Sequence, residues 1–399
     1  MATSNSGAIA VDVKEITVIT PSEATPSHVL PLSTLDSQLF LRFTIEYLLL
    51  YRPHHHHSRH HTAARLKHAL ARSLVPYYPL AGRLRPRPDS PSSWNLLSLQ
   101  VPDVVLSSLP PLILQLTWLH DGSAALALAF NHCIIDGIGT ANFLNSFADL
   151  ASGRSRLSDL RPVPVWDRHL VPSLNAPTTA RTTKTASHHH PEFLKVPDLW
   201  GFAARFDQEP LVPTSVVFDG KKISDMKNMA LKYYGTCNSK SKSKSSYTGF
   251  EVCEREGEGI WGGPHHQEGG VLREWLRAGV RGGERRGGGG LGVGRAAEAV
   301  RRAKDAVGEE GYVREVVEAV GAGACPDMVG VLVVSQWSRL GLDRVDFGMG
   351  NPVSVGPLCT DRYCLILPVF GQRDAVRVVV ALPRSAVARY EYLVRNPTS

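Results

Sequence analysis

The sequence predicts a mixed α/β (α+β) fold in a chain large enough for two domains. Its first half combines short β-strand patterns with amphipathic helix patterns, and a second run of both begins near residue 214. The chain has 399 residues, a length that suits one large domain or two of medium size. Hydrophobic residues make up 43% and charged residues 20% of it, which is typical of a globular protein.

The first two predicted elements are a strand and a helix. Residues 13–19 are apolar at Val13, Ile16, Val18 and Ile19, and this pattern predicts a strand that ends before Pro21. Residues 63–74 carry three leucines at helical spacing. That spacing predicts a helix with one face turned to the core.

A β-hairpin and a helix follow. Residues 112–119 and 124–130 predict two strands, and Asp121-Gly122 between them predicts a tight turn, because both residues tolerate positive φ. Apolar side chains between positions 143 and 150 recur at helical spacing. We therefore expect a core-facing helix directly after the second strand.

The middle of the chain predicts a linker. Residues 152–213 are rich in Pro, Ser, Thr, Arg and His, and we place the crossover linker itself at 181–213. The second half shows strand patterns at 215–218, 329–334, 363–369 and 375–382, and helix patterns at 223–231, 296–307 and 385–394.

One segment of the second half departs from a globular pattern. Between Gly257 and Gly294, 15 of the 38 residues are glycine, with many Glu and Arg and few β-branched residues. Glycine loses much conformational entropy on folding and has no side chain to bury. We expect little regular structure there, and residues 253–290 form an anomalous Gly-rich segment.

Composition narrows the function classes. The net charge of +7 is mild for this length, so it favours an anionic small-molecule partner as readily as a nucleic acid. No apolar run reaches the ~18 residues of a membrane helix, and the first residues lack a signal-peptide pattern. The six cysteines lack CxxC spacing, which favours reduced thiols. We expect a cytoplasmic protein that neither binds nucleic acid nor spans a membrane.

The candidate for chemistry is His132, within Asn131-His132-Cys133-Ile134-Ile135-Asp136-Gly137. Histidine is the side chain best suited to proton transfer near neutral pH, and His132 stands where a predicted strand meets a Gly-containing turn. A chain with 16 histidines contains a His followed four residues later by Asp about once by chance. On this motif alone, a catalytic base and a strand-end histidine bonded to a carbonyl are both open.

Other histidines favour no metal site. His54–His57 with His60 and His61, and His188–His190, are runs without Cys or carboxylate partners, and we interpret them as solvated low-complexity segments.

Further motifs occur in order with the first. Leu32-Ser33-Thr34-Leu35-Asp36, Tyr78-Pro79-Leu80-Ala81-Gly82-Arg83-Leu84, Ser335-Gln336-Trp337-Ser338, Asp346-Phe347-Gly348-Met349-Gly350 and Gly356-Pro357 accompany the HxxxDG sequence at His132. Together they resemble the plant BAHD (HxxxD-type) acyltransferases over about residues 10–250 and 292–396. This resemblance implies two similar chloramphenicol-acetyltransferase-like domains, mixed sheets with flanking helices, and a channel between them. We place the domains at 1–180 and 214–399.

The resemblance also implies the reaction. His132 would act as general base while acyl-CoA, the co-substrate, and an alcohol or amine enter the channel from opposite sides. The implied enzyme is a monomer of plant secondary metabolism, without a bound cofactor, and the segments around 191–207 and Asp361-Arg362-Tyr363-Cys364 favour hydroxycinnamoyl donors. The sequence leaves the residues that contact CoA unassigned.

Four other residues are implied to support the site. Asp136 and Gly137 would set its shape, and Asp346 and Gly348 would be structural, away from the chemistry. Cys133, between His132 and Asp136 on a strand end, is interpreted as a buried packing residue and not as a nucleophile.

Two departures from the family pattern stand out. Met349 occupies the place of a usual Trp, and residues 253–290 replace the segment that would carry the usual arginine partner of Asp346. The alternative function is therefore a catalytically impaired, ligand-binding relative with a disrupted C-terminal domain.

Overall fold

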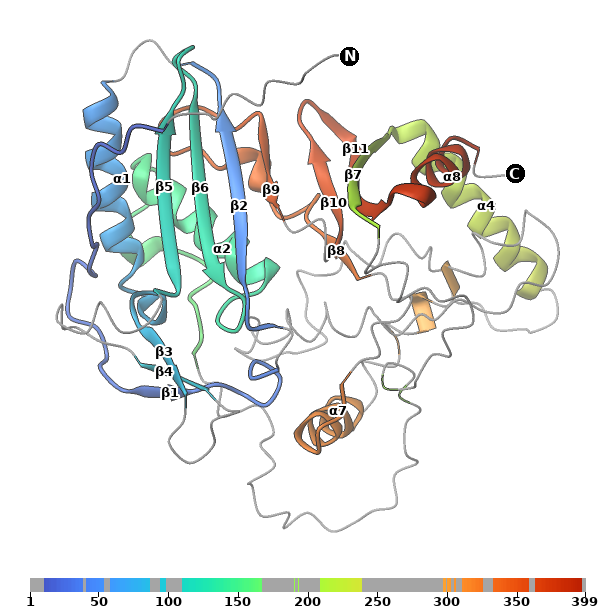
Figure 1. The fold of residues 1–399 in the computed structure, drawn as a ribbon, viewed down its shortest axis with the longest axis horizontal. Helices are drawn as coiled ribbons and strands as arrows, with labels where there is room; N and C mark the ends of the chain where they lie inside the picture. Colours follow the sequence, from blue (N-terminus) through green and yellow to red (C-terminus); the bar gives the residue numbers. More distant parts are fainter. Residues whose placement is uncertain are drawn as a thin grey trace.

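The structure is a computed structural model built around two four-stranded sheets that stand side by side (Figure 1). It describes residues 11–38, 41–53, 58–86, 94–97, 110–166, 190, 193, 209–238, 297–298, 300–302, 305, 311–325, 333–358 and 363–396. The predicted α/β class with two sheets and flanking helices is confirmed.

The first sheet is antiparallel throughout. Its order is β5 (Leu112–Trp118), β6 (Ala124–Asn131), β2 (Thr44–Tyr51) and β9 (Ser354–Pro357). Alternate side chains of β6 are buried, as expected for a strand with one face on the core. The predicted hairpin between β5 and β6 is confirmed.

Helices α1 (Arg59–Ser73) and α2 (Gly137–Ala151) pack against each other and against one face of the first sheet (Figure 1). The leucines predicted to face the core are buried on α1, and Phe143 and Phe147 are fully buried on α2. Both helices therefore match their predicted periodicity.

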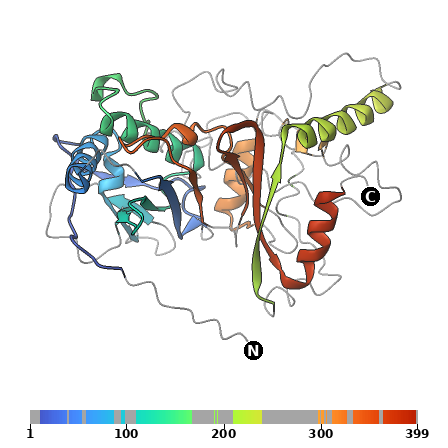
Figure 2. The same ribbon diagram turned by 90° about the horizontal axis from the view of Figure 1, so that it is seen from above.

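The second sheet is mixed. Its order is β7 (Leu211–Phe218), β11 (Gln372–Pro383), β10 (Cys364–Val369) and β8 (Val334–Gln336), and only β10 and β8 run parallel. Helices α4 (Gly220–Asn238) and α8 (Arg384–Arg395) lie on the side of this sheet that faces away from the first sheet (Figure 2). Pro213 falls inside β7, which is an edge strand, where a missing N–H is tolerated.

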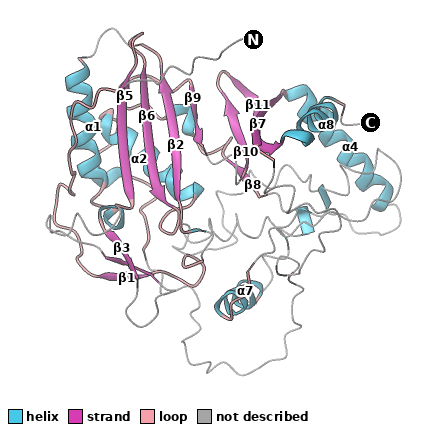
Figure 3. Cartoon of the chain, in the orientation of Figure 1, coloured by secondary structure: helices cyan, strands magenta, loops and turns pink. Residues whose placement is uncertain are grey.

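Smaller elements complete the described chain. A three-stranded sheet of β1 (Val29–Pro31), β4 (Trp94–Leu97) and β3 (Arg83–Pro86) lies below the first sheet, and α7 (Tyr312–Gly321) packs on Leu35 (Figure 3). The short 3-10 helices are η2 (Tyr78–Ala81), η4 (Leu157–Asp159) and η9 (Leu342–Arg344).

The C-terminal half contributes to both sheets. After β8 in the second sheet, the chain passes through η9 and returns as β9, which pairs with β2 so that Tyr47 faces Pro357. The core of the first sheet accordingly includes Trp337, Val345 and Phe347. This passage, residues 333–358, brings the two halves together.

The strand predicted at 13–19 is wrong. Residues 11–20 form no β-ladder, and Ile16 is 90% exposed. A run of apolar, β-branched residues is not sufficient to form a strand, because the segment must also find the free edge of another strand to pair with. The helix predicted at 296–307 is helical at each of its described positions. Residues 253–290 and most of the linker at 181–213 lie outside the described residues, so the domain boundaries stay a prediction.

Within the part of the chain that the structure describes, no helix is long and apolar enough to cross a membrane.

Candidate active site

His132 lies directly after β6, where the strand is held by its neighbour β2. Its backbone N–H donates to the carbonyl oxygen of Phe43, at 3.0 Å, and the last β6 residue, Asn131, faces Thr44 in the ladder. The side chain of His132 is buried, with 2% of the residue exposed. The sheet thus fixes the backbone from which the imidazole projects.

The turn after His132 is held by its own residues. Asn131 Oδ1 accepts the Cys133 N–H at 3.1 Å, and the Cys133 thiol donates to the Leu41 carbonyl at 3.4 Å. Asp136 is the N-cap of α2, and its Oδ1 accepts the Gly139 N–H at 2.7 Å. These contacts explain the spacing of the HxxxDG sequence without a catalytic role for Asp136 or Cys133.

Two aromatic rings lie next to the imidazole. The ring centroids of His132 and Phe43 are 5.2 Å apart, with planes tilted by 53°. The ring of Tyr363, from the C-terminal half, stacks on the imidazole. Its centroid lies 6.3 Å from that of the imidazole, with 25° between the planes. His132 therefore lies beside rings from both halves of the chain, which are themselves 6.5 Å apart.

A narrow pocket lies beside His132, lined by residues of both sheets. Gly137, at the start of α2, lines this pocket, as do Ser335 and Trp337, whose Nε1 donates to Ser335 Oγ at 3.0 Å. The remaining lining residues are uncharged: Ile45, Tyr47, Pro357, Tyr363 and Leu365. Strands of both sheets thus meet at this histidine.

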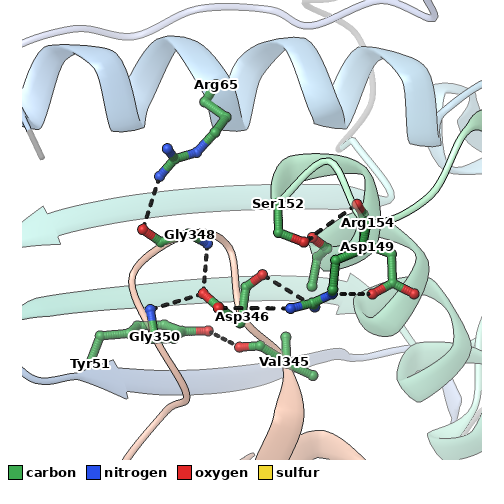
Figure 4. Close-up of polar contacts among 10 residues, drawn as sticks. Tyr51, Arg65, Asp149, Ser152, Arg154, Val345, Asp346, Gly348 and Gly350 are labelled. Atoms are coloured by element: carbon green, nitrogen blue, oxygen red, sulfur yellow. Dashed lines mark hydrogen bonds and ion pairs between the residues drawn. The ribbon is translucent and has the colours of Figure 1, made fainter.

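Asp346 and Gly348 lie in a turn outside the pocket wall (Figure 4). Asp346 Oδ1 accepts the N–H groups of Gly348, at 2.7 Å, and Gly350, at 2.9 Å. Its Oδ2 lies 3.7 Å from a guanidinium nitrogen of Arg154, which also binds Asp149. Among the described residues, the arginine beside Asp346 therefore comes from the segment that directly follows α2.

Two more residues of the first half hold the same turn (Figure 4). Arg65 of α1 donates to the Gly348 carbonyl at 3.2 Å, and the Tyr51 hydroxyl donates to the Val345 carbonyl at 3.0 Å. Burial, and secondarily the charge of Asp346, raise the pKa of Tyr51 well above its usual value. Its hydroxyl therefore keeps the proton that this bond needs.

The comparisons with known proteins decide the family. The model of the Transferase family matches residues 9–93, 86–254 and 294–393. The chain belongs to the BAHD acyltransferase family. The match leaves the Gly-rich segment out, in agreement with the two-part resemblance inferred from the motifs.

The relatives of this BAHD protein are acyltransferases by name. Omega-hydroxypalmitate O-feruloyl transferase of Arabidopsis thaliana is 26% identical and covers 81% of this chain and 79% of its own length. Taxadien-5-alpha-ol O-acetyltransferase of Taxus chinensis is 27% identical, covering 96% of this chain and 95% of itself. (Z)-3-hexen-1-ol acetyltransferase of Arabidopsis thaliana is 30% identical over 53% of this chain and 52% of itself.

Solved structures share the fold. Vinorine synthase superposes with a TM-score of 0.59 at 17% identity, covering 93% of this chain and 94% of its own. A protein of F. graminearum complexed with coenzyme A and T-2 mycotoxin gives 0.61 at 14% identity, covering 92% and 97%. The BAHD chain is thus an acyltransferase with this two-domain fold.

Sequence motifs located some residues of this BAHD site and missed others. His132, Gly137, Ser335 and Trp337 all belong to quoted motifs, and the structure brings them to one pocket. Phe43, Arg65 and Arg154 carried no signal, because a lone aromatic residue and a cation on or after an amphipathic helix are ordinary in any sequence. No cluster of three or more metal-ligating side chains occurs among the residues that the structure describes.

Replacing Gly348 with Ala is expected to destabilise the BAHD fold more than replacing Gly350. Both glycines have positive φ, at +80° and +81°, so each substitution carries the same backbone strain, about 1–2 kcal/mol. A Cβ on Gly348 would lie 2.6 Å from Arg65 Cζ, whereas nothing lies within 4 Å at Gly350. Arg65 must then withdraw and lose its hydrogen bond, which costs about 1 kcal/mol more.

Urea denaturation of the two variants measures this difference. Equal losses of unfolding free energy would mean that the hydrogen bond of Arg65 to residue 348 does not require a glycine there.

Proposed function

We propose that this BAHD acyltransferase moves an acyl group from acyl-CoA to the hydroxyl of an apolar alcohol, with His132 as general base. The observation that carries the proposal is the placement of His132, buried at the wall of a pocket lined from both sheets. A histidine in that position can reach the proton of a bound acceptor.

The chemistry needs only proton transfer and positioning. Nδ1 of His132 is buried, so we assign the transfer to Nε2. Nε2 takes the hydroxyl proton as the oxygen attacks the thioester carbonyl carbon, and the carbonyl π electrons form an oxyanion. Collapse of this tetrahedral adduct breaks the C–S bond, and the departing thiolate takes the proton from the imidazolium. The thioester is already activated, so no protein nucleophile is required.

The lining of the pocket supports an uncharged acceptor. Its described walls contain no Asp, Glu, Lys or Arg. Four of the lining side chains are largely apolar: Ile45, Leu365, Pro357 and Trp337. A charged group would lose its hydration there without a partner. Two of the relatives' names agree with this class of acceptor, taxadien-5-alpha-ol and (Z)-3-hexen-1-ol. A third, ω-hydroxypalmitate, is a largely apolar chain but carries a carboxylate at the end away from its hydroxyl.

For the acyl donor, the proposal names two candidate classes. Two relatives carry feruloyl or caffeoyl in their names and others acetyl, so hydroxycinnamoyl-CoA and acetyl-CoA are the first donors to test. In the proposal, Asp136 and Gly137 shape the site, while Asp346 and Gly348 hold the turn behind the pocket wall. The monomeric state and cytoplasmic location stay predictions.

The test is a thiol-release assay. Purified protein is incubated with feruloyl-CoA or acetyl-CoA and a panel of a fatty alcohol, a short alcohol, a terpenoid alcohol and an aliphatic amine. Release of CoA thiol that depends on an apolar alcohol is expected. Binding of acyl-CoA without turnover on any acceptor would instead establish the alternative, an impaired ligand-binding relative.

A further inference from the structure

We propose that Gly356 is a specificity-determining residue. Because it has no side chain, β9 closes on β10 and keeps the pocket beside His132 narrow, which limits the size of the acceptor alcohol. The proposal deepens the function assigned to His132 and rests on it. Gly356 and its neighbour Leu367 are positioning residues, because neither lines the pocket and both act through residues that do.

Gly356 lies where β9 of the first sheet touches β10 of the second. A Cβ at position 356 would lie 2.9 Å from Leu367 Cδ2 and 3.0 Å from Leu367 Cδ1, with Cγ at 3.6 Å. Gly356 is buried, and Leu367 is half-buried against the core of the first sheet. The two strands are therefore already in contact without a side chain at position 356.

This contact adjoins two walls of the pocket. Pro357 follows Gly356 on β9 and lines the pocket from the first sheet. Leu365 lines it from the second sheet and stands two residues before Leu367 on β10, so the two leucines project from the same face of that strand. The distance between β9 and β10 therefore sets how far apart Pro357 and Leu365 stand.

The ladders leave little room for a methyl group at position 356. Strand β9 is paired with β2, and beyond the ladder the Leu358 N–H donates to the Glu46 carbonyl at 2.8 Å. Strand β10 is held between β11 and β8. An added methyl group must therefore be accommodated by the Leu367 side chain or by a wider gap between the two sheets.

Leu367 cannot clear this space by its terminal torsion alone. A turn of about 120° about χ2 moves one methyl group away but leaves one of the two positions near Gly356 occupied, because staggered rotamers share positions. A change of χ1 would instead remove Leu367 from the core on which it packs. A separation of the strands by about 0.6 Å restores ordinary carbon–carbon contact distances. We therefore expect the sheets to move apart and the pocket to widen.

A double-mutant cycle tests the contact. Gly356→Ala adds the methyl group, and Leu367→Ala removes the atoms that it would meet. The readout is the ratio of kcat/KM for a terpenoid alcohol to kcat/KM for a short alcohol, with acetyl-CoA as donor. Gly356→Ala is expected to raise this ratio about fivefold or more, less than the ~10–200-fold that a methylene group in direct contact with a substrate can give. In the Leu367→Ala background, the same change at position 356 is expected to leave the ratio within about twofold.

Two further variants complete the test. Leu367→Phe presses a larger group against the same glycine, so a rise of the ratio is again expected. Ser354→Ala is the matched control, because Ser354 is exposed on the same strand and its replacement leaves the space between residues 356 and 367 unchanged. It should keep the wild-type ratio. An unchanged or lowered ratio in Gly356→Ala and Leu367→Phe, or an equal rise for Gly356→Ala with and without Leu367, overturns the proposal.

Binding separates this proposal from the proposed function. Calorimetric titration gives the Kd of both alcohols without turnover, and Gly356→Ala is expected to shift the ratio of the two Kd values in favour of the larger alcohol. A shifted Kd ratio in a protein that turns over no acceptor overturns the proposed function alone. Turnover with unshifted ratios overturns the role of Gly356 alone, and the absence of both binding and turnover overturns both.

Discussion

His132→Ala is expected to lower kcat/KM for acyl transfer by about 10²–10⁴-fold, the usual contribution of a positioned general base. The substitution removes the imidazole but leaves the backbone bond to Phe43, so the strand end and the N-cap of α2 are expected to persist. Steady-state thiol release measures the loss, and circular dichroism checks that the fold is retained.

A second histidine provides the control. The sequence placed His190 in a solvated run, but the structure shows it partly buried and bound to Glu315 at 3.0 Å, beside α7 and away from the pocket walls. His190→Ala is expected to keep most of the activity. If the His132 and His190 variants turned over equally well, the assignment of the base would be wrong.

Asp346→Ala is expected to destabilise the protein by about 2–4 kcal/mol, because two backbone N–H groups lose their acceptor. Those donors are Gly348 and Gly350, both bound by Oδ1, and the ion pair with Arg154 is lost as well. Urea denaturation gives the change in unfolding free energy.

Asp346→Asn separates the two contributions. An amide oxygen can still accept both N–H groups, so only the charge opposite Arg154 disappears. That pair is 3.7 Å long, and its side chains are 44% and 26% exposed. It should therefore stabilise by no more than about 1 kcal/mol. An Asn variant as unstable as the Ala variant would show that the ion pair, and not the turn, is the main contribution.

The sequence predicts best those elements whose partners are close along the chain. The β5–β6 hairpin and helices α1 and α2 follow from turn chemistry and periodicity. Strand β9 has only four residues, including Gly356 and Pro357, and no alternating pattern. Its existence depends on the free edge of β2, which no local pattern encodes.

The same distinction applies to the site. His132, Ser335 and Trp337 lie in motifs that can be found by inspection. Phe43 lies in no motif, and Tyr363 lies in a segment that was linked only to the acyl donor, so folding alone places their rings beside the imidazole. Arg154 illustrates a second limit. The pattern of the family directs attention to a segment that this chain replaces, and only the structure places an arginine that follows α2 beside Asp346.

The pairing of β9 with β2 has a consequence for synthesis. Tyr51 binds Val345 across 294 residues of sequence, so the first sheet keeps an open edge until nearly the whole polypeptide has left the ribosome. An exposed strand edge of this kind invites pairing with other chains. A nascent chain stalled before residue 333 would therefore present the edge of β2 to its neighbours, and co-translational chaperones would be needed most for the half that is made first.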